Sequence, residues 1–194
     1  MIRKLKQIKQ CKQNGFTLIE LGIVVAIVLL LMAVGLAKAP AILANQRIAA
    51  DSQEIPQIVT NTQAKYSNRQ NFTGVTLDAI IRLDAFPTNR VTIPGAGAAT
   101  ATNRWGGAIT FTAGTINTAG DIGRFVYASV PAAECKGVIT AVEGSMRRVV
   151  VDSANSGTAG AGTVVKADGG QLDNAALGTA CSGITNSITY DFTK

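Results

Sequence analysis

The sequence predicts an α+β protein in which a long N-terminal hydrophobic helix packs on an antiparallel β-sheet head with one disulfide. Three observations support this prediction. An apolar run extends from Phe16 to Ala37, and an amphipathic helical pattern continues it from Ala39 to about Lys65. Short β-branched segments fill the second half of the chain, where Cys135 and Cys181 also lie.

Residues 1–15 form a basic leader. The formal net charge of the chain is +6, with 18 basic and 12 acidic residues. Five of the basic residues lie before Gly15, so the rest of the chain has 18 − 5 = 13 basic residues against the same 12 acidic ones. They are Arg3, Lys4, Lys6, Lys9 and Lys12. A nucleic-acid site needs clustered basic residues with stacking aromatics, so we predict no nucleic-acid partner for the body.

Residues 16–37 are long enough to cross a bilayer, which takes about 20 residues of helix. Glu20 is the one charged residue in this run. A carboxylate inside a membrane segment costs free energy and by default indicates function. Positive charge before the span predicts a cytoplasmic N-terminus and an exported body. Removal of the span as an ordinary secretory signal remains an alternative, with weak cleavage sites in the segment 32–37.

We expect one long helix over residues 16–66, because its second half has an apolar stripe that can pack on the body. Beyond it, three shorter helices are predicted in the body, residues 67–194. The first is Thr76–Leu83 with Thr76 as N-cap, and the last is Leu172–Ala180. The middle helix opens at Pro131 and turns one face inward. That face carries Cys135, Val138, Ile139 and Val142.

Four strands are predicted from alternating or β-branched residues. They are Ala108–Phe111, Arg124–Val130, Met146–Val151 and Ser187–Phe192. The pair Arg147-Arg148 is expected to flank a strand, and Pro94 to Gly97 is expected to be a loop.

Cys135 and Cys181 are 46 residues apart in a Gly-rich body, whereas Cys11 lies in the leader. An isolated pair in a small polar domain indicates a structural disulfide, which would place the body outside the cytoplasm. Two unrelated buried thiols remain the alternative.

The sequence contains no histidine, so it lacks the commonest general base and metal ligand. The glycine-rich segment 157–162 has no phosphate-loop Lys-Ser/Thr. Asp152 and Asp168 are expected to be solvated surface or turn residues. We therefore predict no catalytic residue, no metal and no cofactor.

The segment Gly15-Phe16-Thr17-Leu18-Ile19-Glu20, after a basic leader and before a long apolar helix, resembles the class III signal of type IV prepilins. The resemblance implies the type IV pilin fold. It also implies cleavage between Gly15 and Phe16 by a prepilin peptidase, with N-methylation of Phe16. Glu20 matches the glutamate at the fifth position of the processed family members. The chain would then be the substrate of an enzyme and not an enzyme.

The new amine of Phe16 gives Glu20 a partner. Within one chain the two groups are four residues apart, so some attraction is possible. In a filament the amine of one subunit could instead meet Glu20 of a neighbour, where an unpaired charge would be costly. We expect this pairing to set the register of assembly.

Trp105-Gly106-Gly107 before the first predicted strand resembles the type IVb pilins of conjugative thin pili. Phe16 as first residue is typical of type IVa instead, whereas the size of the body favours type IVb. By position, residues 67–107 correspond to the family's αβ-loop. A Cys135–Cys181 bond would enclose the family's D-region and join the middle helix to the last strand.

The predicted function is that of a major pilin, the structural subunit of a type IV pilus for adhesion, aggregation or conjugation. Expected partners are further copies of the chain in a helical filament, the prepilin peptidase and the pilus assembly machinery. Expected locations are the bacterial inner membrane before assembly and the cell surface afterwards. The alternatives are a minor pilin, a type II secretion pseudopilin, and a membrane-tethered exported domain that does not polymerise.

Overall fold

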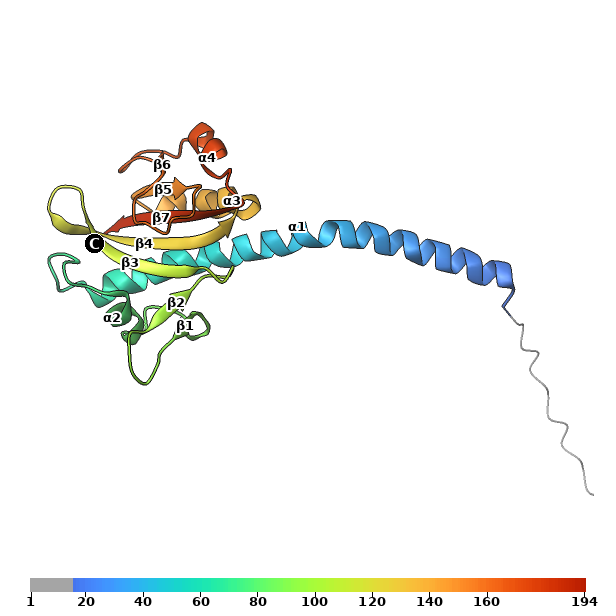
Figure 1. The fold of residues 1–194 in the computed structure, drawn as a ribbon, viewed down its shortest axis with the longest axis horizontal. Helices are drawn as coiled ribbons and strands as arrows, with labels where there is room; N and C mark the ends of the chain where they lie inside the picture. The colour runs from blue at the N-terminus through green and yellow to red at the C-terminus, as the bar shows by residue number, and fades with distance from the viewer. Residues whose placement is uncertain (1–15) are drawn as a thin grey trace, which may run out of the picture. The chain divides into compact units, whose positions relative to one another are not determined.

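The computed structural model describes residues 16–194 (Figure 1). Helix α1, Leu18–Lys65, is 48 residues long and includes both Pro40 and Pro56. The chain divides into two compact units, one ending at Ile42 and the other running from Leu43 to Lys194. The second unit, called the head below, therefore contains the last part of α1. The division into residues 1–15, 16–66 and 67–194 stays a prediction, and the leader lies outside the described residues.

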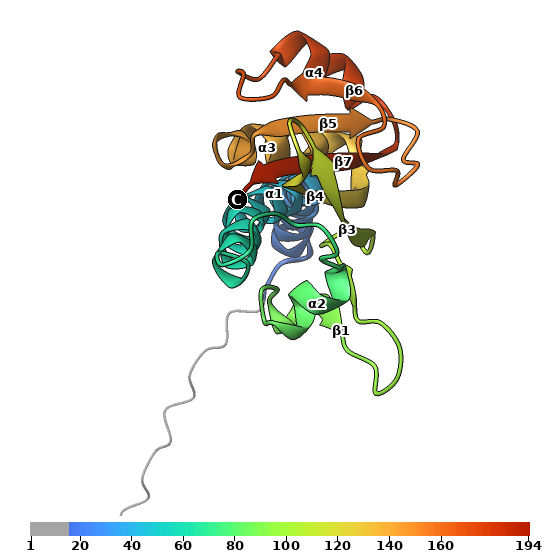
Figure 2. The ribbon, with the colours of Figure 1, turned by 90° about the vertical axis from the view of Figure 1, so that its left-hand side faces the viewer.

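The head is built on a seven-stranded antiparallel sheet with strand order β1-β2-β3-β4-β7-β5-β6. The strands are β1 Val91–Thr92, β2 Thr100–Thr102, β3 Ala108–Thr115, β4 Ala119–Pro131, β5 Arg148–Asp152, β6 Thr163–Lys166 and β7 Thr185–Thr193. The shorter helices are α2 Leu77–Arg82, α3 Ala132–Val142 and α4 Asn174–Ala180, with 3-10 turns η1 Thr88–Arg90 and η2 Glu143–Ser145. Figure 2 shows α4 and β6 at one end of the head and α2 and β1 at the other.

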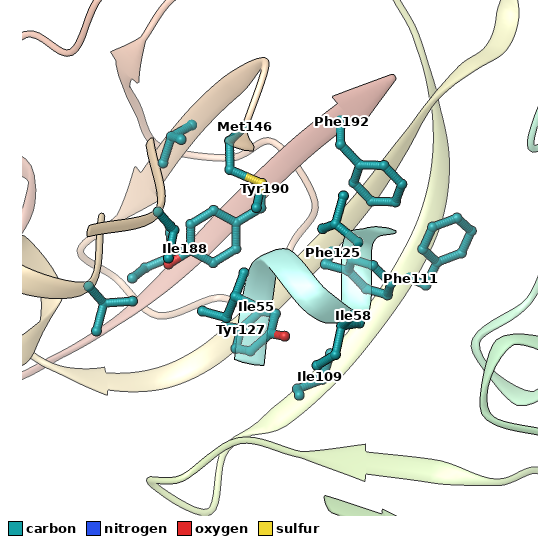
Figure 3. Packing of buried hydrophobic residues seen from close by; sticks show 14 of the residues in the cluster. Ile55, Ile58, Ile109, Phe111, Phe125, Tyr127, Met146, Ile188, Tyr190 and Phe192 are labelled. Atoms are coloured by element: carbon teal, nitrogen blue, oxygen red, sulfur yellow. The ribbon is translucent and has the colours of Figure 1, made fainter. Parts of the chain in front are cut away.

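The core of the head lies between α1 and one face of the sheet (Figure 3). Ile55 and Ile58 of α1 are buried there, and Phe125 of β4 stacks on Phe192 of β7 with ring centroids 5.3 Å apart. Each such apolar side chain contributes about 2 kcal/mol when fully buried. Burial at these positions holds the second half of α1 on the sheet.

The opposite face of β7 is polar and also buried. Ser187, Thr189 and Asp191 alternate with the core residues along this strand. Asp191 lies directly across from Arg124 of β4 and Arg148 of β5, and its carboxylate accepts two hydrogen bonds from the Arg124 guanidinium, at 2.6 and 2.9 Å. Opposite charges on adjacent strands stabilise this pairing register.

Most predicted elements are confirmed. Thr76 caps α2, because its side chain accepts a hydrogen bond from the Ala79 N–H. Helix α3 starts directly after Pro131 and buries the predicted face, including Cys135. The four predicted strands correspond to β3, β4, β5 and β7, and β5 begins at Arg148.

Two expectations are corrected. Cys181 is the C-cap of α4 and precedes β7, so the disulfide joins α3 to the end of α4 and not to the last strand. Asp152 is the last residue of β5, and it is buried rather than a solvated surface or turn residue. The Asp152 carboxylate accepts hydrogen bonds from the Ser156 hydroxyl and from the Ala154 and Ser156 N–H groups. These bonds, the one from the hydroxyl most of all, hold the pKa of Asp152 below its ordinary value.

Candidate functional site

The first turn of α1 begins at Leu18, just beyond Phe16 and Thr17. The Thr17 hydroxyl accepts a hydrogen bond from the Glu20 N–H at 3.3 Å, and the Thr17 carbonyl accepts one from Leu21 at 3.1 Å. Thr17 therefore acts as an N-cap, and its spacing to Glu20 is that of a capping box. The cap leaves Phe16 outside the helix.

Glu20 and Phe16 are both exposed in the single chain, Phe16 with 77% of its surface accessible. Within the described residues, no ion pair is formed by Glu20. The predicted partner, the amine of Phe16, exists only after cleavage. Gly15 lies outside the described residues, so the cleavage position stays a prediction.

The first part of α1 is apolar on all sides. Every residue from Phe16 to Leu36 is exposed, and none of the most apolar window of α1 is buried. This helix is long and apolar enough to cross a membrane. A helix that is hydrophobic all round requires lipid or other helices around it.

Within the head, partly buried ion pairs join α1 to Arg90 and Arg104. Asp51 accepts a hydrogen bond from Arg104 Nε at 2.7 Å, and Glu54 pairs with Arg104 and with Arg90 Nε, the latter at 3.0 Å. The Asp51 side chain is 4% exposed, and its second oxygen, Oδ2, has no hydrogen-bond partner within the described structure. Burial raises the pKa of Asp51 to about 6, against the lowering effect of Arg104. Sequence reasoning missed this cluster, because its members are up to 53 residues apart.

A second contact joins α1, α3 and the Trp105-Gly106-Gly107 turn. The Glu134 carboxylate on α3 accepts a hydrogen bond from the Trp105 indole N–H and pairs with Arg47 of α1 at 3.5 Å. Asn103 organises the turn, because its Oδ1 accepts the N–H groups of Trp105 and Gly107. The turn thus places the tryptophan against the junction of two helices.

The structure brings together one of the predicted residue pairs directly. Cys135 and Cys181 form a disulfide with Cα atoms 5.9 Å apart, and both residues are buried. The Thr17 cap was missed, although Thr followed three residues later by Glu before an apolar run is a known helix-start pattern. No group of residues able to hold a metal ion was found in the described part of the chain.

Two family models match the chain. One, described as PilS N terminal, matches residues 45–193, and one described as a prokaryotic N-terminal methylation motif matches residues 10–36. The chain belongs to the PilS family of type IVb pilins. It is therefore a pilus subunit.

Solved structures with the same fold include two type IV pilins. The pilin resembles a type IVb pilin from Salmonella typhi with a TM-score of 0.54 and 17% identity, covering 75% of this chain and 99% of that one. It resembles TcpA, a type IV pilin from the Vibrio cholerae El Tor biotype, with a TM-score of 0.52 and 15% identity, covering 76% and 99%. No curated protein sequence matches the pilin significantly.

Proposed function

We propose that the pilin is the major subunit of its pilus, cut between Gly15 and Phe16 by a prepilin peptidase and N-methylated at Phe16. Its first helix then leaves the inner membrane and becomes part of a helical filament of identical subunits on the cell surface. The role is structural and not catalytic. The observation that carries this proposal is an apolar α1 segment, exposed on all sides, whose one charge is Glu20.

Two environments can cover the apolar surface of this segment. Lipid covers it in the membrane, and further copies of the same helix cover it in a filament. Transfer between two apolar surroundings costs little in hydrophobic free energy, since lipid tails are as apolar as leucine side chains. Charge then decides the register of the helices.

Glu20 and the Phe16 amine supply that charge. The Thr17 cap starts the helix at Leu18, so Phe16 precedes the first turn and lies outside the helix. In this position the amine can reach a carboxylate on a neighbouring helix. A neighbour docked out of register would leave a carboxylate and an ammonium unpaired in an apolar environment, at a cost of several kcal/mol.

Replacement of Glu20 tests assembly. Cells that produce Glu20→Ala should yield at least about tenfold less sheared filament than wild type, because loss of one charge pair costs more than 1.4 kcal/mol. The variant should accumulate in the inner membrane. Glu143→Ala, which removes a carboxylate from the head, is the matched control and should assemble normally.

Mass spectrometry of sheared material tests processing and abundance. The expected N-terminus is methylated Phe16, and the pilin should be the dominant protein of the filaments. Filaments in which it is a trace component would make it a minor pilin. An unprocessed chain displayed without filaments would support the tethered-domain alternative and overturn the proposal.

A further inference from the structure

The head contains a pocket of about 480 Å³ that has no part in the proposed assembly. It lies between the end of α3 with η2 and the segment from β6 to α4. The residues that line it include Thr140, Glu143, Lys166, Gln171, Leu172 and Asn174. This volume is in the range of small-molecule sites.

The walls of the pocket are fixed by hydrogen bonds and by the disulfide. Lys166 forms a backbone bridge with Leu172, and the Asp173 N–H donates to the Val165 carbonyl at 2.8 Å. Asp173 caps α4, and the end of α4 is bonded covalently to α3 through Cys181. The pocket is thus preformed, so a ligand does not have to order its walls.

Lys166 is the unusual residue of this pocket. It is only 9% exposed, and its ammonium donates one hydrogen bond, to the Glu143 carbonyl at 2.5 Å. An ammonium has three donors, and a buried charge is ordinarily paired. Between residues 16 and 194, no carboxylate forms an ion pair with Lys166. Its remaining donors are available to a ligand.

The other groups of the pocket select the class of ligand. Glu143 also lines the pocket, so its negative charge disfavours a simple anion there, and the charge of Lys166 disfavours a simple cation. A hydroxyl group donates and accepts, and therefore satisfies both charges. The amides of Gln171 and Asn174 add further donors and acceptors, and Leu172 offers an apolar surface to C–H groups.

We propose that this pocket binds one neutral sugar ring, such as the terminal hexose of a glycan. A zwitterionic amino acid would also match the two charges, so glycine is included among the probes as the competing ligand class. A hexose has about 12 non-hydrogen atoms, and at the binding efficiency per atom of drug-sized ligands its dissociation constant falls near the millimolar range.

Titration of the isotope-labelled full-length pilin tests the proposal, with backbone amide signals read by NMR. The probes are the methyl glycosides of glucose, galactose and mannose, whose blocked anomeric carbon imitates the end of a glycan chain. The detergent must have no sugar head group. At least one glycoside should shift the Gly144 and Gly170 signals saturably, while glycine should not. Shifts with glycine alone, or with none of the probes, would overturn the proposal.

Exposed amides provide the variants, because Lys166 also holds η2 and its replacement would change the walls. Gln171→Ala with Asn174→Ala should weaken glycoside binding by about tenfold, the loss expected when two modest hydrogen bonds are removed. Gln53→Ala with Asn89→Ala removes two exposed amides elsewhere in the head and should leave binding unchanged. Equal binding by both double variants contradicts the assignment.

Discussion

Asp51 lies in an environment that differs strongly from that of an ordinary surface acid. Its carboxylate is buried between α1 and the sheet, where the hydroxyls of Tyr127 and Tyr190 also have no hydrogen-bond partner in the described structure. Arg104 donates a hydrogen bond to one carboxylate oxygen of Asp51, which lowers its pKa. Desolvation has the larger effect and raises the pKa. The charged form of Asp51 is therefore a cost to the folded head at neutral pH.

The pH dependence of stability follows from this cost. Because the pKa of Asp51 rises from 3.8 to about 6 on folding, the folded state binds the proton more tightly. The Asp51 contribution to the free energy of unfolding is greatest below the unfolded pKa and is lost as the pH rises through about 6. Between about pH 7 and about pH 5 the head should gain roughly 1 kcal/mol from this group.

Thermal unfolding of the full-length pilin at both pH values measures the gain, as the difference between wild type and Asp51→Asn. Asp78→Asn is the control, because Asp78 is partly exposed and its pKa is lowered, mainly by the Ala99 N–H. Its removal should not reduce the gain on acidification. An Asp51→Asn variant with the same pH profile as wild type would show that the buried carboxylate does not titrate in this range.

At the scale of elements, the Trp105-Gly106-Gly107 turn connects β2 to β3 and packs against β4. Gly107 is followed by β3, and a Cβ atom there would lie 2.6 Å from the Ala128 carbonyl carbon and 2.9 Å from Asn103 Nδ2. Asn103 Nδ2 donates to the Ala128 carbonyl, so the side chain and the strand cannot separate without losing that bond. Only glycine fits at this close approach.

Gly107→Ala should therefore destabilise the head by about 3 kcal/mol, because the turn must move away from β4 and expose the Asn103 bonds. Chemical denaturation with the wild-type slope and a lower midpoint is the expected measurement. Gly144→Ala is the matched control, since no atom lies within 4 Å of a Cβ added at Gly144. Equal stability of the two variants would mean that the turn relaxes freely.

The elements that could be predicted from sequence are those with strong local signals. Thr76 identified α2, Pro131 identified the start of α3, and β-branched runs identified β5 and β7. The 13-residue strand β4 was predicted too short, because Gly120 and Gly123 at its start resemble a turn. Strands β1, β2 and β6 were missed, since segments of two to four residues carry no measurable periodicity.

The residues of the candidate site also divide into those with a local sequence signal and those that only the fold brings together. Phe16 and Glu20 could be selected because the signal segment is continuous in sequence. Arg104 and Asp51 could not be paired, because their contact depends on the fold bringing the β2–β3 turn to α1. Local sequence patterns predict an element, whereas a long-range ion pair can be predicted only when the positions of both elements in the fold are known.

At the scale of the whole molecule, charge is divided between a basic segment, residues 1–15, and a body that is nearly neutral. Five basic residues precede Gly15 without an acid, and the remaining 13 basic residues are balanced by 12 acidic ones. In the head, most arginines form ion pairs with carboxylates. The leader is therefore the part of the chain that can determine membrane orientation.

The disulfide makes this orientation measurable. We expect replacement of the leader's Arg3, Lys4, Lys6, Lys9 and Lys12 by glutamine to leave a large fraction of heads in the cytoplasm, where thiols stay reduced. Such a precursor keeps three free thiols, at Cys11, Cys135 and Cys181, whereas a correctly inserted precursor keeps only Cys11. Thiol alkylation followed by mass spectrometry distinguishes the two forms. Exchange of lysine for arginine and of arginine for lysine at the same positions preserves the charge and should preserve the oxidised head. Full oxidation in the glutamine variant would show that orientation is set by α1 or the head instead of by the leader.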